Sequence, residues 1–408
     1  MSNEPRIMLL PSPPSSGSVG SISKSLGIAK VLQKRGCVVG FIVGGRLAEL
    51  VRSYGYLVYD YPIPVTSGAA GSIRSAADFI EWTGMADPDF IRQAVEAEME
   101  AIRNFRPNAI FAECRPSSSI SVPASGIPSL MIASWPAHPL FPANIKYPGS
   151  KKSIEAFNMI LEEYGLEEIN NLAELLFSRA DVKMAPTLRE LEPELAALKE
   201  FNFAGYILDL DDIHNEKLEW HQNWADKPLI FIYLSVSAIP PTIYLDMVRK
   251  IFDNQPYRVA CLCGFHYNLK ELPANTDNIY FDWFIPAASI MKETSLVIFH
   301  GGQDTMLTAI LHGLPTITVP GQHFERDYNS TQLQKLGLSY KMPVHAFRPS
   351  RVLQIVKEAL SQDKIELHKE YMSKLQALNG TERCCTALIE LVQKNDKGAI
   401  TDEAVYFI

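Results

Sequence analysis

The chain has 408 residues, of which 47% are hydrophobic and 21% charged, and its formal net charge is −8. This length exceeds one ordinary core, so we expect two α/β domains of about 200 residues each. The hydrophobic content excludes a largely disordered chain. The acidic balance argues against a dedicated nucleic-acid binder, which would carry a basic stripe or patch.

Cysteine usage and hydropathy bear on the compartment. The six cysteines show no spacing with histidine that is typical of a metal site, so we expect buried free thiols in a reducing compartment. The first residues contain no charged region followed by an apolar stretch. No run reaches the ~18 apolar residues that span a bilayer. These features predict a cytoplasmic protein without a transmembrane segment.

The first half of the chain alternates apolar runs with amphipathic stretches, as parallel α/β domains do. It opens with a strand at 6–10, a loop rich in Pro, Ser and Gly, a helix near 22–32 and an apolar strand at 37–43, which is a Rossmann-like order. The mixed segment 62–86, with Trp82 near its end, either lines a substrate pocket or packs on the domain. Further strands are predicted at 56–59, 108–112, 129–133, 182–185 and 201–206, and helices at 46–54, 88–105 and 151–180.

The composition changes between the two halves. Residues 208–227 are polar and acidic without a clean period, which predicts an interdomain linker. We therefore expect one Rossmann-like domain over 1–207, a second over 228–395, and a tail, 396–408, that packs back on the first domain. In the second domain strands are predicted at 229–235, 257–263, 296–299 and 316–319, and helices at 241–254, 349–360, 363–377 and 382–393.

One short stretch of the second half carries recognisable chemistry. The apolar strand at 296–299 runs into His300, Gly301 and Gly302, and a helical pattern follows as far as Gly313. A helix N-terminus entered through glycines exposes backbone N–H groups and a partial positive charge, so it favours anions. A phosphate or diphosphate is the expected occupant.

This stretch resembles the donor-binding signature of nucleotide-sugar-dependent glycosyltransferases. The matching positions are His300, Gly301, Gly302, Thr305, Gly313, Pro315, Pro320, Glu325 and Asn329. The resemblance implies the GT-B fold: two Rossmann-like α/β domains, each a parallel sheet flanked by helices, with a cleft between the domains. It also implies a UDP- or dTDP-sugar as donor substrate, held without a metal ion or a cofactor.

The resemblance assigns roles to individual residues. His300, the backbone N–H groups of 301–305 and the Thr305 hydroxyl would hold the diphosphate and stabilise charge on the leaving group. Glu325 would accept hydrogen bonds from the sugar hydroxyls. The predicted donor-binding set is Ser237, Trp283, Phe284, His300, Gly301, Gly302, Thr305, Thr308, Glu325, Arg326 and Asn329.

Some of these positions depart from the family pattern or have a second interpretation. Thr308 stands where many relatives carry a Glu that binds the ribose hydroxyls, which favours a dTDP-sugar. Arg326 replaces a frequent Gln and leaves the sugar open. Ser237 follows a strand that lacks the usual Gly. Trp283 and Phe284 are candidates for stacking on the nucleotide base, with core packing as the alternative for Trp283.

The acceptor side departs further from the family. Ser18 stands at the position of the usual catalytic histidine, and a hydroxyl is a poor base near neutral pH. Glu113 matches the carboxylate that normally orients that histidine. His138, in a loop after a strand, is a replacement candidate, alone or as a pair with Glu113. The other options are a carboxylate acting directly as base, an acceptor acidic enough to need little base, or a chain that binds a nucleotide sugar without transferring it.

Together these residues predict an inverting, metal-independent glycosyltransferase that moves a sugar from a dTDP- or UDP-sugar to a small or lipophilic acceptor. The alternative is a catalytically impaired nucleotide-sugar-binding or auxiliary protein of the same fold. The expected partners are the nucleotide sugar and the acceptor, with no nucleic acid, and a homodimer is one option.

Overall fold

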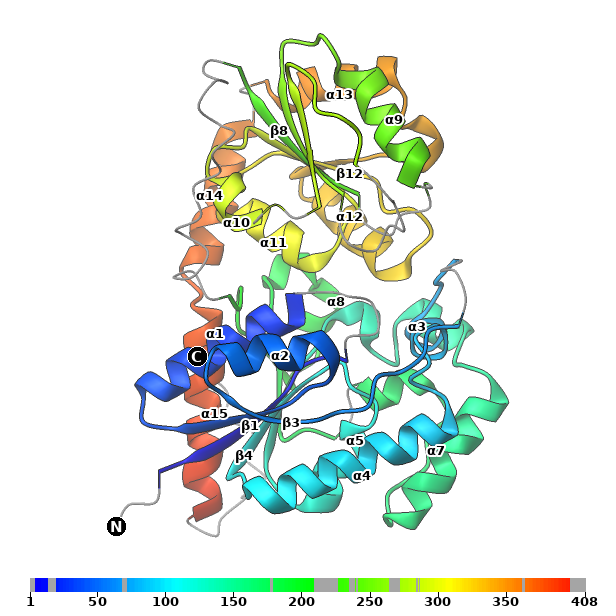
Figure 1. Cartoon of the computed structure of the whole chain (residues 1–408), viewed down its shortest axis with the longest axis vertical. Helices are drawn as coiled ribbons and strands as arrows, with labels where there is room; N and C mark the ends of the chain where they lie inside the picture. The colour runs from blue at the N-terminus through cyan, green and yellow to red at the C-terminus, as the bar shows by residue number, and fades with distance from the viewer. Residues whose placement is uncertain are drawn as a thin grey trace. The chain divides into compact units, whose positions relative to one another are not determined.

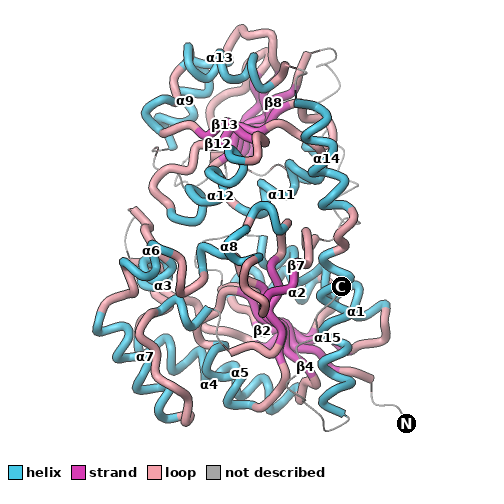
Figure 2. The backbone as a smooth tube through the Cα atoms, turned by 180° about the vertical axis from the view of Figure 1, so that it is seen from behind, coloured by secondary structure: helices cyan, strands magenta, loops and turns pink. Residues whose placement is uncertain are grey.

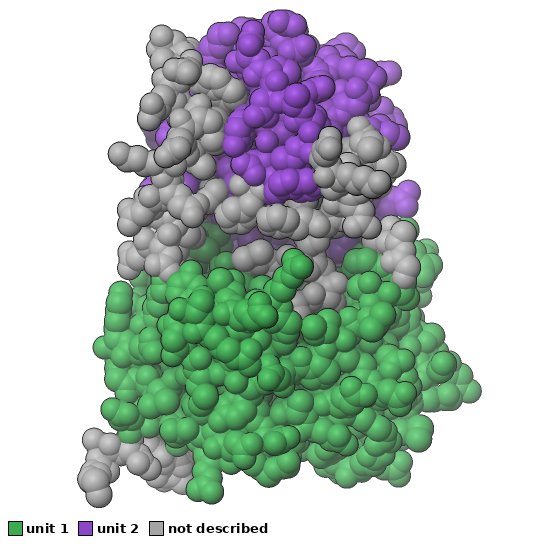
Figure 3. Space-filling view, viewed as in Figure 1, with its two compact units in different colours: residues 1–209, 378–408 green, residues 210–377 purple. Residues whose placement is uncertain are grey.

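The computed structural model describes residues 4–13, 20–67, 72–176, 179–208, 227–234, 239, 241–263, 272–283, 285, 287–361 and 364–396. The chain divides into two compact units, residues 1–209 with 378–408, and residues 210–377 (Figure 3). Each unit is a twisted parallel sheet with helices on both faces (Figures 1 and 2). The expected GT-B architecture of two parallel α/β domains is confirmed.

The first unit contains a seven-stranded sheet in the order β3-β2-β1-β4-β5-β6-β7. Its strands are β1 (Arg6–Leu10), β2 (Val38–Ile42), β3 (Leu57–Tyr59), β4 (Ala109–Glu113), β5 (Ser129–Ile132), β6 (Val182–Ala185) and β7 (Phe201–Phe203). Its α-helices are α1 (Gly20–Lys34), α2 (Gly45–Ser53), α3 (Ala76–Trp82), α4 (Pro88–Phe105), α5 (Ser118–Ser125), α6 (Pro142–Lys146), α7 (Lys151–Glu163), α8 (Pro193–Ala196) and α15 (Gly380–Asp396). Its 3-10 helices are η2 (Trp135–Ala137), η3 (Leu172–Leu176) and η4 (Arg189–Leu191).

The strand order decides where a ligand belongs in this sheet. The chain runs outward from β1 in one direction through β2 and β3, and then returns to the other side of β1 with β4. The point where the order reverses therefore lies between β1 and β4. In open parallel sheets, ligands bind beyond the carboxyl ends of the strands at such a switch point.

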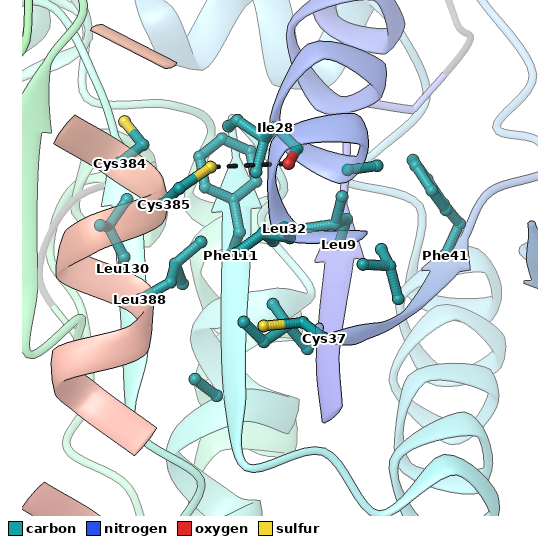
Figure 4. Close-up of a cluster of buried hydrophobic side chains, with 14 of the residues drawn as sticks. Leu9, Ile28, Leu32, Cys37, Phe41, Phe111, Leu130, Cys384, Cys385 and Leu388 are labelled. Atoms are coloured by element: carbon teal, nitrogen blue, oxygen red, sulfur yellow. Dashed lines mark hydrogen bonds between the residues drawn. The ribbon is translucent and has the colours of Figure 1, made fainter. Parts of the chain in front are cut away.

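The core of the first unit fills both faces of the sheet because its central strands are apolar throughout. Successive residues of a strand point to opposite faces. Ile7 packs with α1 and α15, whereas Met8 packs with α4. Figure 4 shows side chains of α1 and α15 meeting over β4, where the Cys385 thiol lies 3.5 Å from the carbonyl oxygen of Ile28.

The last helix corrects the predicted domain boundary. The sequence predicts that the second domain extends to residue 395, whereas the second unit ends at Ala377 and α15 packs against α1, β4 and β5. The reason is that α15 completes the core of the first unit, with Cys384 and Leu388 fully buried there. Nearly all of the predicted tail, and all of the predicted linker except residues 208 and 227, lie outside the described residues.

The amphipathic stretch 151–180 is also not one helix. α7 ends at Glu163, and two residues later Gly165 adopts a left-handed backbone with φ of 66°. That conformation favours glycine and ends a helix. The apolar residues farther on form η3 instead, which places Leu172 and Leu175 in the core.

The second unit contains a six-stranded sheet in the order β10-β9-β8-β11-β12-β13, and its switch point lies between β8 and β11. Its strands are β8 (Leu229–Tyr233), β9 (Arg258–Leu262), β10 (Ile279–Asp282), β11 (Leu296–Phe299), β12 (Thr316–Thr318) and β13 (Ser339–Lys341). Its helices are α9 (Pro241–Phe252), α10 (Ala287–Met291), α11 (Gln303–Leu311), α12 (Phe324–Lys335), the 3-10 helix η7 (Val344–Ala346), α13 (Pro349–Ala359) and α14 (Ile365–Gln376). α9 and α13 cover one face of the sheet, and α10, α11, α12 and α14 lie on the other (Figure 1).

Candidate functional site

The predicted anion loop lies at the switch point of the second unit. β11 ends at Phe299, and His300 follows it beside the last residue of β8. The backbone N–H of His300 donates to the carbonyl oxygen of Tyr233 at 3.2 Å, and Nδ1 of the His300 ring lies 3.2 Å from the same oxygen. A carbonyl only accepts, so Nδ1 carries a proton. For Nε2 also to donate to a ligand, the ring must be an imidazolium, which a bound anion would stabilise.

Two glycines bring the loop close to its surroundings. Gly301 has φ of 89°, and a Cβ there would lie 2.6 Å from Oγ of Ser330 and 2.7 Å from the carbonyl oxygen of Arg326. A Cβ on Gly302 would lie 2.5 Å from Nε2 of His300. Both positions therefore favour glycine. At Gly301 a side chain would strain the backbone and overlap α12, and at Gly302 it would overlap the His300 imidazole.

The N-terminus of α11 is left open by this loop. Gly302 is the N-cap residue, and no side chain caps the helix. The first backbone hydrogen bond of the helix is from Met306 to the Gly302 carbonyl at 3.0 Å. The N–H groups of the residues before Met306 therefore lack intrahelical acceptors. Thr305 is half-buried in this first turn.

α12 supplies the other predicted contacts at this edge of the sheet. Asn329 is buried, and its side-chain amide donates to the Gly301 carbonyl at 3.0 Å, so it supports the loop itself. Glu325 and Arg326 lie half-buried in the first turn of α12. The structure thus brings His300, the two glycines and the start of α12 close together at this edge of the sheet.

Other predicted donor residues have different surroundings. Thr308 is buried, and its hydroxyl donates to the Asp304 carbonyl one turn earlier at 2.7 Å. Trp283 follows β10 and packs, half-buried, against the core of the second unit, which agrees with the core-packing alternative. Ser237 and Phe284 lie outside the described residues, as does Ser18 on the acceptor side.

A second polar cluster lies at the switch point of the first unit. Glu113, the last residue of β4, is 8% exposed. Its Oε1 is 2.9 Å from Nζ of Lys24, which is 6% exposed, and its Oε2 accepts from the Ser21 hydroxyl at 2.6 Å. The Ser21 oxygen in turn accepts from the backbone N–H of Ser12 at 2.8 Å. We call Ser21, Lys24 and Glu113 the Glu113 cluster.

His138 lies in another environment. It follows η2, stacks on the Trp135 ring with a centroid distance of 5.0 Å, and meets the Phe201 ring edge-on. Its Nδ1 accepts the backbone N–H of Leu140 at 3.1 Å, which puts the proton of the neutral ring on Nε2. Burial lowers the pKa of His138 below its usual value, and the charge of Lys183 lowers it further, against an opposite effect of Glu200. The expected pairing of His138 with Glu113 is not what these contacts show, because Glu113 pairs with α1.

Sequence reasoning missed the two residues of α1 that bind Glu113. A signal was present, because Lys24 lies one helical turn before Ile28 and two turns before Leu32, on the buried face of an amphipathic helix. A lysine on an apolar face is almost never buried without an anionic partner. The partner is 89 residues away along the chain and could not be identified without the fold.

A third cluster, fully buried, supports the loop after β1. Arg115 donates through Nε and Nη2 to the Pro11 carbonyl at 3.1 and 2.5 Å, and through Nη2 to the Ile42 carbonyl at 2.8 Å. Its Nη1 lies 3.3 Å from Oε1 of Glu98, and its guanidinium lies 4.0 Å from the centroid of the Tyr61 ring. Burial raises the pKa of Glu98, and the charge of Arg115 opposes that shift. Arg115 therefore holds the carboxyl ends of β1 and β2 together, because it donates hydrogen bonds to a carbonyl oxygen at each of them.

The segment 62–86 borders a shallow, open depression of about 450 Å³ on the first unit. It is lined by Ser67, Ser72, Ile73, Arg74, Asp78, Glu81 and Trp82. The charges in its wall are largely compensated, because Arg74 forms a two-pronged pair with Asp78 at 2.7 and 3.0 Å. The indole N–H of Trp82 is buried without a hydrogen-bond partner among the described residues. The segment thus both packs on the domain, with Ile80 and Met85 buried, and borders an open depression.

Neither a bilayer-spanning helix nor a metal-ligand cluster is found in the described part of the chain. None of its helices combines the length and the apolar composition needed to span a bilayer. The described residues also contain no group of three or more His, Cys, Asp or Glu side chains arranged to hold a metal ion.

A family model and a curated relative both match this chain to glycosyltransferases. The model of the glycosyltransferase family 28 C-terminal domain matches residues 246–383. A "PGL/p-HBAD biosynthesis glycosyltransferase" of Mycobacterium tuberculosis (strain ATCC 25177 / H37Ra) is 22% identical over 294 residues, which are 66% of this chain and 67% of that protein.

Solved structures share the fold. The glycotransferase of kitacinnamycin superposes with a TM-score of 0.77 at 18% identity, over 96% of this chain and all of that one. The glycosyltransferase VinC, solved in complex with dTDP, superposes with a TM-score of 0.68 at 12% identity, over 95% of this chain and all of that one. The two parallel-sheet units define the GT-B class, and the family match and the relative identify the chain as a glycosyltransferase of that class.

Proposed function

We propose that this chain transfers a sugar from a nucleoside-diphosphate sugar, with the diphosphate held at the N-terminus of α11. The observation that carries the proposal is the open N-terminus of α11 beside His300, at the switch point of the second sheet. Glycines at 301 and 302 leave no side chain between the loop and its surroundings. N–H groups without intrahelical acceptors and a helix dipole at such a point bind phosphate groups.

The same contacts would serve the reaction. When the bond between the anomeric carbon and the diphosphate breaks, negative charge grows on the leaving oxygen. Fixed N–H donors and an imidazolium at His300 stabilise that charge, and the stabilisation is larger in the transition state than before it. We propose direct displacement with inversion, in which no metal ion is required because the helix terminus and His300 neutralise the diphosphate.

The choice of substrates rests on the relatives and on single residues. VinC was solved with dTDP, and the family resemblance at Thr308 favours the same nucleotide, so we propose a dTDP-sugar with a UDP-sugar as the second option. The relatives include a glycotransferase of kitacinnamycin and a protein of PGL/p-HBAD biosynthesis, so we propose a small or lipophilic natural product as acceptor.

A thermal-shift experiment tests the donor site. dTDP and UDP should each raise the melting temperature of the full chain, since a ligand at 100 times its Kd stabilises by about 2.7 kcal/mol. His300→Ala should abolish most of the shift. His345→Ala, an exposed histidine in η7 of the same unit, is the matched control and should retain it.

Two results would contradict the proposal. One is that no nucleoside diphosphate, GDP included, stabilises the chain. The other is that His300→Ala and His345→Ala bind the nucleotide equally well. Slow release of dTDP or UDP from the sugar donor in the absence of an acceptor, lost in His300→Ala, would further separate a transferase from a protein that only binds the donor.

A further inference from the structure

We infer that Asn329 is a positioning residue for the diphosphate of the donor, which acts through the peptide unit between Gly301 and Gly302 and does not touch the donor. The inference rests on the proposed function, because that peptide unit leads into the N-terminus of α11. It changes the role of Asn329, which the family resemblance places among the donor contacts.

The side chain of Asn329 is committed to the loop before α11. Asn329 lies in the second turn of α12, is 3% exposed, and donates from Nδ2 to the carbonyl oxygen of Gly301 at 3.0 Å. A carbonyl oxygen only accepts, so the amide nitrogen, and not the amide oxygen, faces it. The partner therefore fixes the orientation of this side-chain amide.

The same side of α12 fits closely against Gly301. Asn329 and Ser330 follow Arg326 by three and four residues, so the three lie on one side of the helix. A Cβ on Gly301 would lie 2.7 Å from the Arg326 carbonyl oxygen and 2.6 Å from Oγ of Ser330. The loop thus rests directly on α12, with Gly301 at a φ of 89°, and the hydrogen bond from Asn329 stabilises it there.

This hydrogen bond also sets the direction of a backbone donor. In a trans peptide unit the C=O and the N–H point in opposite directions. Because the Gly301 carbonyl points to Asn329, the N–H of Gly302 points away from it. Gly302 is the N-cap residue of α11, so this N–H joins the donors proposed to hold the diphosphate. Rotation of the peptide unit would replace that donor by a carbonyl oxygen, which repels a phosphate.

α12 is a firm support for the loop because it is anchored to the sheet. Nζ of Lys341 in β13 lies 2.6 Å from Oδ1 of Asp327 and donates to the Thr331 hydroxyl at 2.8 Å. Glu325, the expected sugar contact, belongs to the first turn of the same helix. Asn329 therefore fixes the loop to the helix that carries the sugar contact.

Asn329→Asp tests this role in the full-length protein, because the introduced carboxyl has the shape of the amide and a charge that depends on pH. The protonated carboxyl donates an O–H to the Gly301 carbonyl, whereas a carboxylate faces it with a second acceptor. The nucleotide is whichever of dTDP and UDP binds the unmodified chain more tightly. Relative to the unmodified chain at the same pH, we expect its affinity to be within about 3-fold at about pH 5 and at least about 10-fold lower at about pH 8.

Asn278→Asp is the matched control. Asn278 is another buried asparagine of the second unit, and its Nδ2 donates to the carbonyl oxygens of Phe252 and Tyr257 at 2.8 and 2.9 Å. It precedes β10, at the opposite edge of the parallel sheet. This variant should lose stability as pH rises but keep its nucleotide affinity within about 3-fold. An equal loss of affinity in both variants would show that Asn329 only stabilises the unit, which would overturn the inference.

Hydrogen exchange without nucleotide separates positioning from direct contact. At about pH 8 the backbone amides of 301–305 should exchange at least about 10-fold faster in Asn329→Asp than in the unmodified chain, because the loop is released before a ligand binds. Unchanged exchange together with weakened nucleotide binding would mean that Asn329 touches the donor itself, and would refute the inference.

Asn329→Ala keeps the test decisive if Asn329→Asp does not fold at the higher pH. It removes the donor without adding a charge, so its nucleotide affinity should be about 10-fold lower at both pH values. If the unmodified chain binds none of dTDP, UDP and GDP, the proposed function fails and the inference fails with it. If the unmodified chain binds a nucleotide and neither variant weakens that binding, the inference alone is refuted.

Discussion

Replacing Arg115 with Met should be among the most destabilising single changes in the first unit. Arg115 is fully buried and forms the only ion pair of Glu98 among the described residues. Glu98 is fully buried as well. The Met side chain keeps most of the volume but removes the donors to Pro11 and Ile42. Glu98 then retains only the hydroxyls of two serines, and its charge becomes uncompensated.

The magnitude follows from burial. Removing one member of a buried pair costs about 3–5 kcal/mol, because the remaining charge stays desolvated. The pair of Arg92 with Glu163 is the matched control: its two hydrogen bonds, 2.8 and 2.6 Å long, are as good, but both side chains are more than 40% exposed. Arg92→Met should therefore cost far less than Arg115→Met, because solvent screens the exposed pair.

Hydrogen exchange of peptides from β1 and β4, measured across a urea series, reports the free energy of unfolding of the first unit. The loss in Arg115→Met should also grow as pH rises. Without Arg115 the folded-state pKa of Glu98 moves further upward, and a carboxyl with a raised pKa loses stability with increasing pH. The double variant Glu98→Leu/Arg115→Met should recover most of the loss. If Arg115→Met and Arg92→Met differ by less than about 1 kcal/mol, burial is not what makes this pair matter.

Two further outcomes concern the second unit. Gly301→Ala should destabilise it by about 2–4 kcal/mol in urea unfolding, because a left-handed Ala costs about 1 kcal/mol and its Cβ would also overlap the Arg326 carbonyl. Gly337 is the control, since its φ of 76° is similar but a Cβ there has its nearest contact at 3.3 Å. A loss of equal size in Gly337→Ala would contradict the steric argument. Burial, together with the nearby charge of Lys364, lowers the pKa of His368 to about 4. Between pH of about 6.5 and 4 the unfolded chain therefore takes up a proton that the folded chain does not, so the second unit should lose stability as pH falls through this range. An equally steep pH dependence in His368→Leu would assign the effect to another group.

The accuracy of the sequence-based predictions depended on how local the information was. β11, the glycines after it and α11 were predicted because the apolar run, the turn residues and the helical period are contiguous in the sequence. α4 was predicted with the observed bounds, since Asp87 caps it and Pro88 opens it. The stretch 151–180 failed because the apolar period alone does not show that Gly165 interrupts it.

The sequence by itself determined the class of fold and the place of the glycine turn before α11, because strand and helix periods and turn residues are local properties of the chain. Only the tertiary structure decided that α15 completes the first unit, since its apolar face matches a core built some 350 residues earlier. Only the tertiary structure paired Glu113 with Lys24, because burial of a charge depends on which elements meet around it.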